Sequence, residues 1–78
     1  MELKTLRKNR KKYIAEMVKM SDKKLSKNLD LVRIQMEIAF KTRNETTLAN
    51  LYEMEDQIVT ARRIKFDAEY NRQFAGTK

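Results

Sequence analysis

The absence of helix breakers constrains this chain more than any other feature. The sequence has no proline and a single glycine, Gly76. Proline and glycine are the residues that most strongly disfavour a helix interior, so only capping residues can interrupt helices before that point. The sequence therefore predicts an all-α protein.

Two short polar stretches have the composition of helix caps. Ser21 precedes Asp22, and Asn44 precedes Glu45 in a threonine-rich turn, so each places a side-chain oxygen where unpaired helix N–H groups need an acceptor. These caps predict helices over residues 2–20, 22–43 and 45–75 of one domain spanning 1–78. Because both connections are short, we expect a small up-down-up three-helix bundle with a long third helix. Without the break at Asn44, one helix of about 54 residues would have to pair with a second chain.

Apolar residues recur at three- and four-residue spacing in all three segments. The line in segment 2–20 consists of Leu3, Leu6, Tyr13, Met17 and Met20, with Ile14 and Val18 beside it. Segment 22–43 carries a first line of Leu25, Leu29, Val32, Met36 and Phe40 and a second line of Leu31, Ile34 and Ile38. The line in segment 45–75 consists of Leu48, Leu51, Met54, Ile58 and Ala61. Two apolar lines predict that helix 22–43 is packed between the other two.

The missing residue types exclude several functions. The chain has neither cysteine nor histidine, which rules out disulfides, the usual zinc sites, histidine acid-base chemistry and cysteine nucleophiles. It also has no glycine-rich phosphate loop and no recognisable nucleophile-base pair, so we expect no enzyme and no cofactor. A carboxylate-only site for a hard metal stays possible, although no spacing favours one.

Hydropathy gives no reason to expect a membrane protein. No apolar run approaches the roughly 20 residues needed to cross a bilayer, and no signal-peptide pattern follows the charged first residues. We therefore expect a cytoplasmic protein. Attachment to an anionic membrane surface is disfavoured because segment 2–20 has no tryptophan or phenylalanine on its apolar side.

Positive charge is concentrated in the first part of the chain. The formal net charge is +7. Residues 1–43 carry 13 cations and five anions, whereas residues 44–78 carry five cations and six anions. A polyanion should therefore meet the first two helices rather than the third.

The densest cationic run holds six cations in nine positions, residues 4–12. Cations there oppose the helix macrodipole, so folding alone does not favour them. We predict a nucleic-acid-binding accessory or regulatory protein that contacts backbone phosphates of DNA or RNA. The predicted contacts are Lys4, Arg7, Lys8, Lys11, Lys12, Lys23, Lys24 and Lys27. The plainer alternative is a solvated face, with Glu53, Glu55 and Asp56 paired to arginines of the first helix.

The third helix supports a different interpretation. At about 1.5 Å per residue it should be roughly 46 Å long and overrun its neighbours. Its end would bring cations to the turn near residue 21 and carry aromatic rings four residues apart. The alternative function is a protein-binding adaptor or inhibitor that docks on an acidic protein or forms a homodimer. Its partner-binding residues would be Arg62, Arg63, Phe66, Tyr70 and Phe74.

Overall fold

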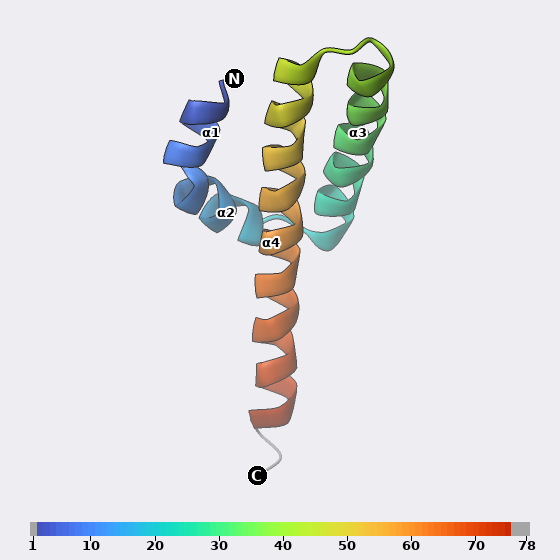
Figure 1. Ribbon diagram of the computed structural model, residues 1–78. Coiled ribbons are helices and arrows are strands. Elements are labelled where there is room, and N and C mark those ends of the chain that lie inside the picture. Colours follow the sequence, from blue (N-terminus) through green and yellow to red (C-terminus); the bar gives the residue numbers. More distant parts are fainter. Residues whose placement is uncertain (1, 76–78) are drawn as a thin grey trace.

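The computed structural model describes the backbone of residues 2–75 and the side chains of residues 2–72. This part of the chain forms four helices: α1 (Leu3–Lys8), α2 (Arg10–Val18), α3 (Asp22–Lys41) and α4 (Glu45–Ala75). The protein is all-α, and its long C-terminal helix packs against the earlier ones (Figure 1). None of the described helices is both long enough and apolar enough to cross a membrane.

Helix α4 is the centre of the molecule. Helices α1 and α2, which we call the α1–α2 limb, lie along one side of α4, and α3, the second limb, lies along the other side (Figure 1). The two limbs have few contacts with each other apart from the turn that joins them. The prediction that helix 22–43 is the packed-between helix is therefore wrong. The radius of gyration is 14.8 Å, against about 11.5 Å for a compact chain of this length, because α4 extends beyond both limbs.

The first predicted helix is divided in two. Residues 2–20 do not form one helix, because Asn9 has φ −99° and ψ 16° and separates α1 from α2. The Asn9 side chain donates a hydrogen bond to the Thr5 carbonyl at 3.3 Å. Asparagine competes for nearby backbone groups in this way, which makes it a weak residue for a helix interior. Because of the bend, the first limb consists of two short helices of six and nine residues.

Both predicted caps form. The Ser21 hydroxyl accepts a hydrogen bond from the Lys24 amide at 3.1 Å, and the Asn44 side chain accepts one from the Thr47 amide at 3.2 Å. Between α3 and α4, Arg43 adopts φ 55°. The Asn44 amide donates to the Ala39 carbonyl and the Arg43 amide donates to the Phe40 carbonyl. This is the hydrogen-bond pattern of a Schellman motif, so α3 ends at Lys41 and α4 begins as a separate helix.

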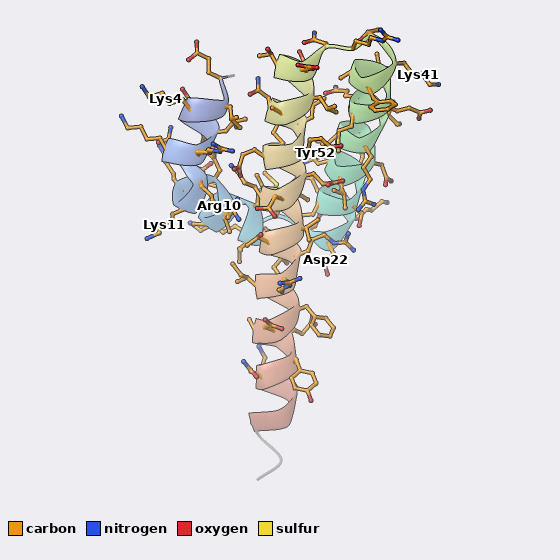
Figure 2. All side chains as sticks on the ribbon, in the orientation of Figure 1. Lys4, Arg10, Lys11, Asp22, Lys41 and Tyr52 are labelled. Atoms are coloured by element: carbon orange, nitrogen blue, oxygen red, sulfur yellow. The ribbon has the colours of Figure 1, made fainter. Side chains whose placement is uncertain are left out.

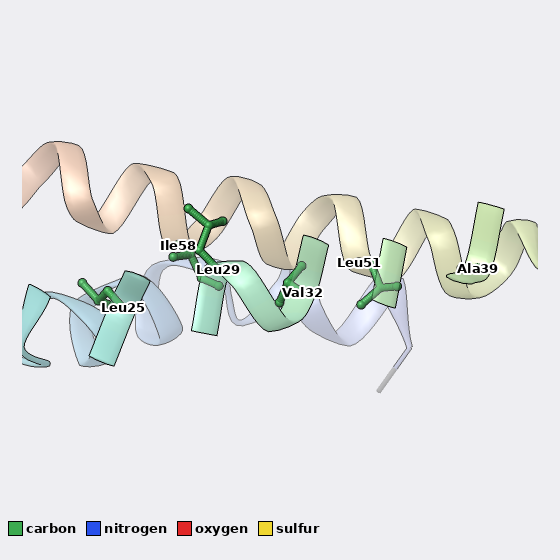
Figure 3. Packing of buried hydrophobic residues seen from close by; sticks show 6 residues of the cluster. All are labelled: Leu25, Leu29, Val32, Ala39, Leu51 and Ile58. Atoms are coloured by element: carbon green, nitrogen blue, oxygen red, sulfur yellow. The ribbon is translucent and has the colours of Figure 1, made fainter. Parts of the chain in front are cut away.

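The core lies between α3 and α4. Its buried cluster consists of Leu25, Leu29, Val32, Ala39, Leu51 and Ile58 (Figure 3). The first predicted apolar line of α3 is thus confirmed over most of its length. The prediction is wrong for Phe40, because its side chain is 71% exposed. Ala39 is buried at this end of the core instead, since a small residue fits where the chain turns from α3 into α4.

The second apolar line of α3 is uncovered. Leu31, Ile34 and Ile38 are 50%, 55% and 57% exposed. They follow one another along α3 at three- and four-residue spacing. We call these three residues the α3 ridge.

The overhang of α4 is confirmed. Every side chain from Phe66 to Arg72 is exposed, whereas Ala61 is fully buried. In Figure 1 this part of α4 projects below both limbs. About two turns of α4 therefore extend past both limbs with exposed side chains.

Candidate nucleic-acid interface

The inner face of the α1–α2 limb is neutralised by α4. One guanidinium nitrogen of Arg10, Nη1, lies 2.6 Å from Glu53 Oε2 and 2.6 Å from Asp56 Oδ2. Hydrogen bonding to Asp56, and then to Glu53, raises the pKa of Arg10 above its ordinary value, although burial opposes that rise. Arg7 approaches the same Glu53 carboxylate at 3.8 Å with a side chain that is 69% exposed. The two arginines nearest α4 are thus held by its acids.

A buried amide completes this polar contact. Gln57 is 1% exposed, and its Nε2 donates to the Leu6 carbonyl at 3.0 Å and to Glu53 at 3.2 Å. The Glu53 side chain is only 12% exposed, so its charge requires these donors. Glu53 and Gln57 therefore link α1, α2 and α4 at one point.

The expected pairing of acids with first-helix arginines is confirmed for Glu53 and Asp56. Glu55 instead pairs with Arg33 of α3 at 3.2 Å. The three acids lie within four residues of each other, so they point to different sides of α4. Glu53 and Asp56 therefore contact the α1–α2 limb, and Glu55 contacts α3.

The lysines of α1 and α2 are arranged differently from the arginines. Lys4, Lys8, Lys11, Lys12 and Lys19 are all exposed, and none of them forms an ion pair with any side chain that the structure describes. Lys4 and Lys8 are four residues apart on α1, and Lys12 and Lys19 are seven residues apart on α2 and its C-cap, so the members of each pair share a face. Figure 2 shows Lys4 and Lys11 pointing away from α4 while Arg10 points toward it. We call these five residues the lysine strip.

One acid accompanies the lysine strip. Glu16 is the only acidic residue between Lys4 and Lys19, and it makes no ion pair with a described side chain. The strip spans 16 residues, or roughly 24 Å of helix. A nucleic-acid backbone carries several phosphates over a length of this size.

The remaining predicted phosphate contacts lie around the turn after α2. Lys23, Lys24 and Lys27 are exposed in the first turns of α3 and make no ion pair with a described residue. Lys65 of α4 reaches this turn, where its ammonium donates to the Met20 carbonyl and lies 2.9 Å from Asp22 Oδ1. The predicted meeting of α4 cations with the turn near residue 21 is therefore confirmed for Lys65.

The predicted partner-binding residues lie on the overhang or just before it. Arg62 and Arg63 are exposed. The rings of Phe66 and Tyr70 stack on each other with centroids 6.3 Å apart and an interplanar angle of 25°. They are 67% and 51% exposed. Phe74 belongs to α4, but its side chain lies outside the described residues.

The sequence interpretation expected arginines of the first helix to pair with acids of α4 but did not single out Arg10. It lies in the apolar line of segment 2–20, where it interrupts an otherwise regular spacing. A cation on a face that packs against another helix needs an acid opposite it, and α4 holds an acidic cluster. Those two facts together were a signal for the Arg10–Glu53 pair. The burial of Gln57 has no comparable signal.

Comparison with protein-family models, with curated proteins and with solved structures gives no significant match. Among the described residues, no three acidic side chains come together in a way that could hold a metal ion.

Proposed function

We propose that this protein associates with nucleic acid through backbone phosphates. The observation that supports this most directly is the lysine strip. Glu53, Asp56 and Glu55 of α4 pair with Arg7, Arg10 and Arg33, whereas the five lysines pair with no side chain that the structure describes. Lysines held this way can displace the counterions of a polyanion, and the gain from that release favours binding.

Lys23, Lys24 and Lys27 extend the same cationic surface around the turn into α3. Arg7 lies at its inner edge and is shared with Glu53. The contacts are to phosphate rather than to base edges, because lysine is a flexible point charge and no bidentate arginine is free on this side of the limb. Binding should therefore show little sequence preference.

The test is a salt titration of affinity for a fluorescent oligonucleotide, single-stranded and duplex, on nuclease-treated protein. We compare Lys8→Gln/Lys11→Gln with the matched control Arg33→Gln/Lys41→Gln. Both variants remove two positive charges, but the control cations already have partners in Glu55 and Glu37. The strip variant should lower the slope of log K against log salt by about 1.4–1.8. The control should change the slope by less than about half as much.

Two outcomes would contradict the proposal. One is an absence of binding at about 50 mM salt, where electrostatic association is strong. The other is an equal effect of the two variants, which would mean that net charge matters and the strip does not.

A second candidate function is favoured by the exposed aromatic pair. Phe66 and Tyr70 stack on each other on the exposed end of α4, with Arg62 and Arg63 one turn before Phe66. Exposed rings beside arginine are typical of protein-binding hot spots. On this view the protein is an adaptor or inhibitor whose overhang enters a groove on an acidic protein.

The adaptor function is tested by affinity selection with the full chain and with Phe66→Ser/Tyr70→Ser, after nuclease treatment. A specific partner should be retained by the wild-type chain and lost with the variant. Circular dichroism should show similar helicity for both, since both side chains are exposed. Equal retention of the same proteins by both chains would contradict this function.

A further inference from the structure

The charge of α4 changes sign along the helix. Residues 45–60 carry four acids and no cation, whereas residues 61–72 carry four cations and two acids. Three acids of the first part, Glu53, Glu55 and Asp56, pair with arginines of the two limbs. The low net charge of the third helix therefore conceals a cationic end, which attracts polyanions as the first two helices do.

The stacked rings of Phe66 and Tyr70 lie within this cationic end. Arg62 precedes Phe66 by four residues and Arg63 precedes it by three, so both arginines are neighbours of the rings on the helix surface. Both arginines are exposed, and neither forms an ion pair with a side chain that the structure describes. Two guanidinium groups and two aromatic rings thus share one exposed part of α4.

Two acids also lie beside the rings. Asp67 and Glu69 are exposed, and each follows a cation of α4 by four residues, a spacing at which opposite charges on a helix attract. They weaken the positive potential around the rings. They do not cancel it, because the cations of residues 61–72 outnumber them by two to one.

The rings begin where α4 meets the turn between the limbs. The ammonium of Lys65 lies 2.9 Å from Asp22 Oδ1 at the start of α3. Phe66 is the next residue of α4, and Lys23 and Lys24 are the next residues of α3. Figure 2 shows Asp22 at the end of α3 beyond which α4 projects. The rings are therefore close to the cations that extend the proposed phosphate-binding surface into α3.

We propose that Phe66 and Tyr70 form a base-stacking site and that the preferred ligand is single-stranded nucleic acid; this inference rests on the proposed binding of backbone phosphates. Stacking of bases on aromatic rings stabilises single-strand complexes with little sequence preference, since every base has a π face. In a duplex those faces are covered by the neighbouring base pairs. Arg62 and Arg63 are placed to contact phosphates next to the stacked base.

The positions of the other exposed rings support this choice of ligand. Tyr52 is 55% exposed, but it lies next to the acids of residues 53–56, which repel phosphate. Phe66 and Tyr70 instead lie next to arginines and near lysines. An acidic protein would also be attracted to the arginines. A strand is favoured because the cations proposed to hold its backbone lead directly to the rings.

The test compares three fluorescent probes of equal length on nuclease-treated full-length protein: single-stranded oligothymidylate, its duplex, and an abasic strand that has the same backbone without bases. The variant is Phe66→Leu/Tyr70→Leu. Leucine keeps an apolar side chain and favours helix, but it has no π face. Affinity for oligothymidylate should fall at least roughly fivefold, the loss expected when one base no longer stacks.

The other two probes make the result specific. Affinity for the duplex and for the abasic strand should change less than about twofold, because neither presents an accessible base. The slope of log K against log salt should stay the same for all three probes, since the variant removes no positive charge. Loss of affinity without loss of slope distinguishes the rings from the lysine strip.

The matched control is Phe40→Leu/Tyr52→Leu. It also removes one phenylalanine and one tyrosine, which are 71% and 55% exposed, from other parts of the molecule. Its affinity for oligothymidylate should change less than about twofold. Circular dichroism should show wild-type helicity for both variants, because all four side chains are exposed.

The outcomes separate this inference from the proposed function. If the wild type binds none of the probes at about 50 mM salt, phosphate binding itself is wrong and the stacking site with it. If the wild type binds them and Phe66→Leu/Tyr70→Leu binds oligothymidylate equally well, only the stacking site is wrong. Equal losses on the abasic strand, or an equal loss in the control, would also overturn it. Loss of a protein partner with unchanged oligothymidylate affinity would assign the rings to the adaptor function instead.

Discussion

The two limbs of this protein attach to α4 by different means. Helix α3 has 20 residues, capped ends and a seam of buried leucine, valine and alanine. The α1–α2 limb has two helices of six and nine residues without side-chain caps, and it contributes Leu6 and Ile14 to the buried core. Its remaining hold on α4 is polar, through Arg10, Glu53 and Gln57. The α1–α2 limb, which carries the lysine strip, should therefore be the less stable of the two.

A physical reason connects the two properties. The first turns of α1 and α2 contain no acid, and basic residues there oppose the macrodipole. Short helices depend on packing for stability, because helix nucleation is unfavourable. A cationic outer face thus lowers the stability of the limb, and the ion pairs of the inner face offset part of that loss.

The largest effect should come from the apolar seam. Leu29→Ala should lower the free energy of unfolding by about 3 kcal/mol, because it leaves a cavity at a residue that is 2% exposed. Urea titration followed by circular dichroism measures this change. Phe40→Ala is the control on the same helix and should cost less than about 0.5 kcal/mol, since Phe40 is exposed. Similar values for both would mean that the seam is not the core.

The polar attachment should have a smaller effect. Arg10→Met should lower the free energy of unfolding by about 1–2 kcal/mol, because Glu53 loses its cationic partner in a site that is 12% exposed. Solvent screening limits the loss, as the Arg10 side chain is itself 34% exposed. The control Arg33→Met removes the more exposed pair with Glu55 and should cost less than about 0.5 kcal/mol.

The pKa of Arg10 determines how the stability loss in Arg10→Met varies with pH. The pKa of Arg10 is raised by Asp56 and Glu53, so its stabilising contribution is fully present below its unfolded-state pKa and is lost only as pH rises through the folded-state value. Both values lie in strong alkali. The difference in stability between wild type and Arg10→Met should therefore stay constant as the pH is raised from 7 to about 9. A difference that disappears over this range would contradict the assigned ion pair.

Hydrogen exchange should separate the two limbs directly. Amides of α1 and α2 should exchange at least roughly tenfold faster than those in the middle of α3, which corresponds to a local opening about 1.4 kcal/mol easier. Raising the salt concentration should narrow that difference, because it screens the repulsion within the exposed cationic face more than the partly buried Arg10–Glu53 pair. Uniform protection of both limbs would show that they open as one unit.

The smallest effect concerns the junction of α3 and α4. Arg43→Gly should raise the free energy of unfolding by about 0.5–1 kcal/mol, because glycine adopts a positive φ without the steric cost that arginine carries. The control Lys41→Gly, placed in the last turn of α3, should lower it by up to about 1 kcal/mol. Thermal or urea unfolding measures both. A destabilising Arg43→Gly would mean that the arginine side chain has a role at this turn.

The candidate sites also differ in how much of them the sequence predicted. Four of the five lysines of the strip, all but Lys19, were predicted from composition and spacing, because solvated side chains on a helix need no tertiary information. The exposure of the α3 ridge was not predicted, since it depends on how the other helices are arranged around α4. Leu31, Ile34 and Ile38 illustrate the difference. Their apolar character indicated a covered face, but only the arrangement of helices shows that this chain leaves it open.

The sequence by itself determined the helices and most of their ends. Ser21, Asn44 and the absence of proline act through hydrogen bonds and sterics within a few residues, so local chemistry is sufficient. The tertiary structure decided which helix is central and which apolar line is buried. It also brought Arg10 to Glu53 across 43 positions. These outcomes depend on how all the helices share a limited apolar surface, which no single segment specifies.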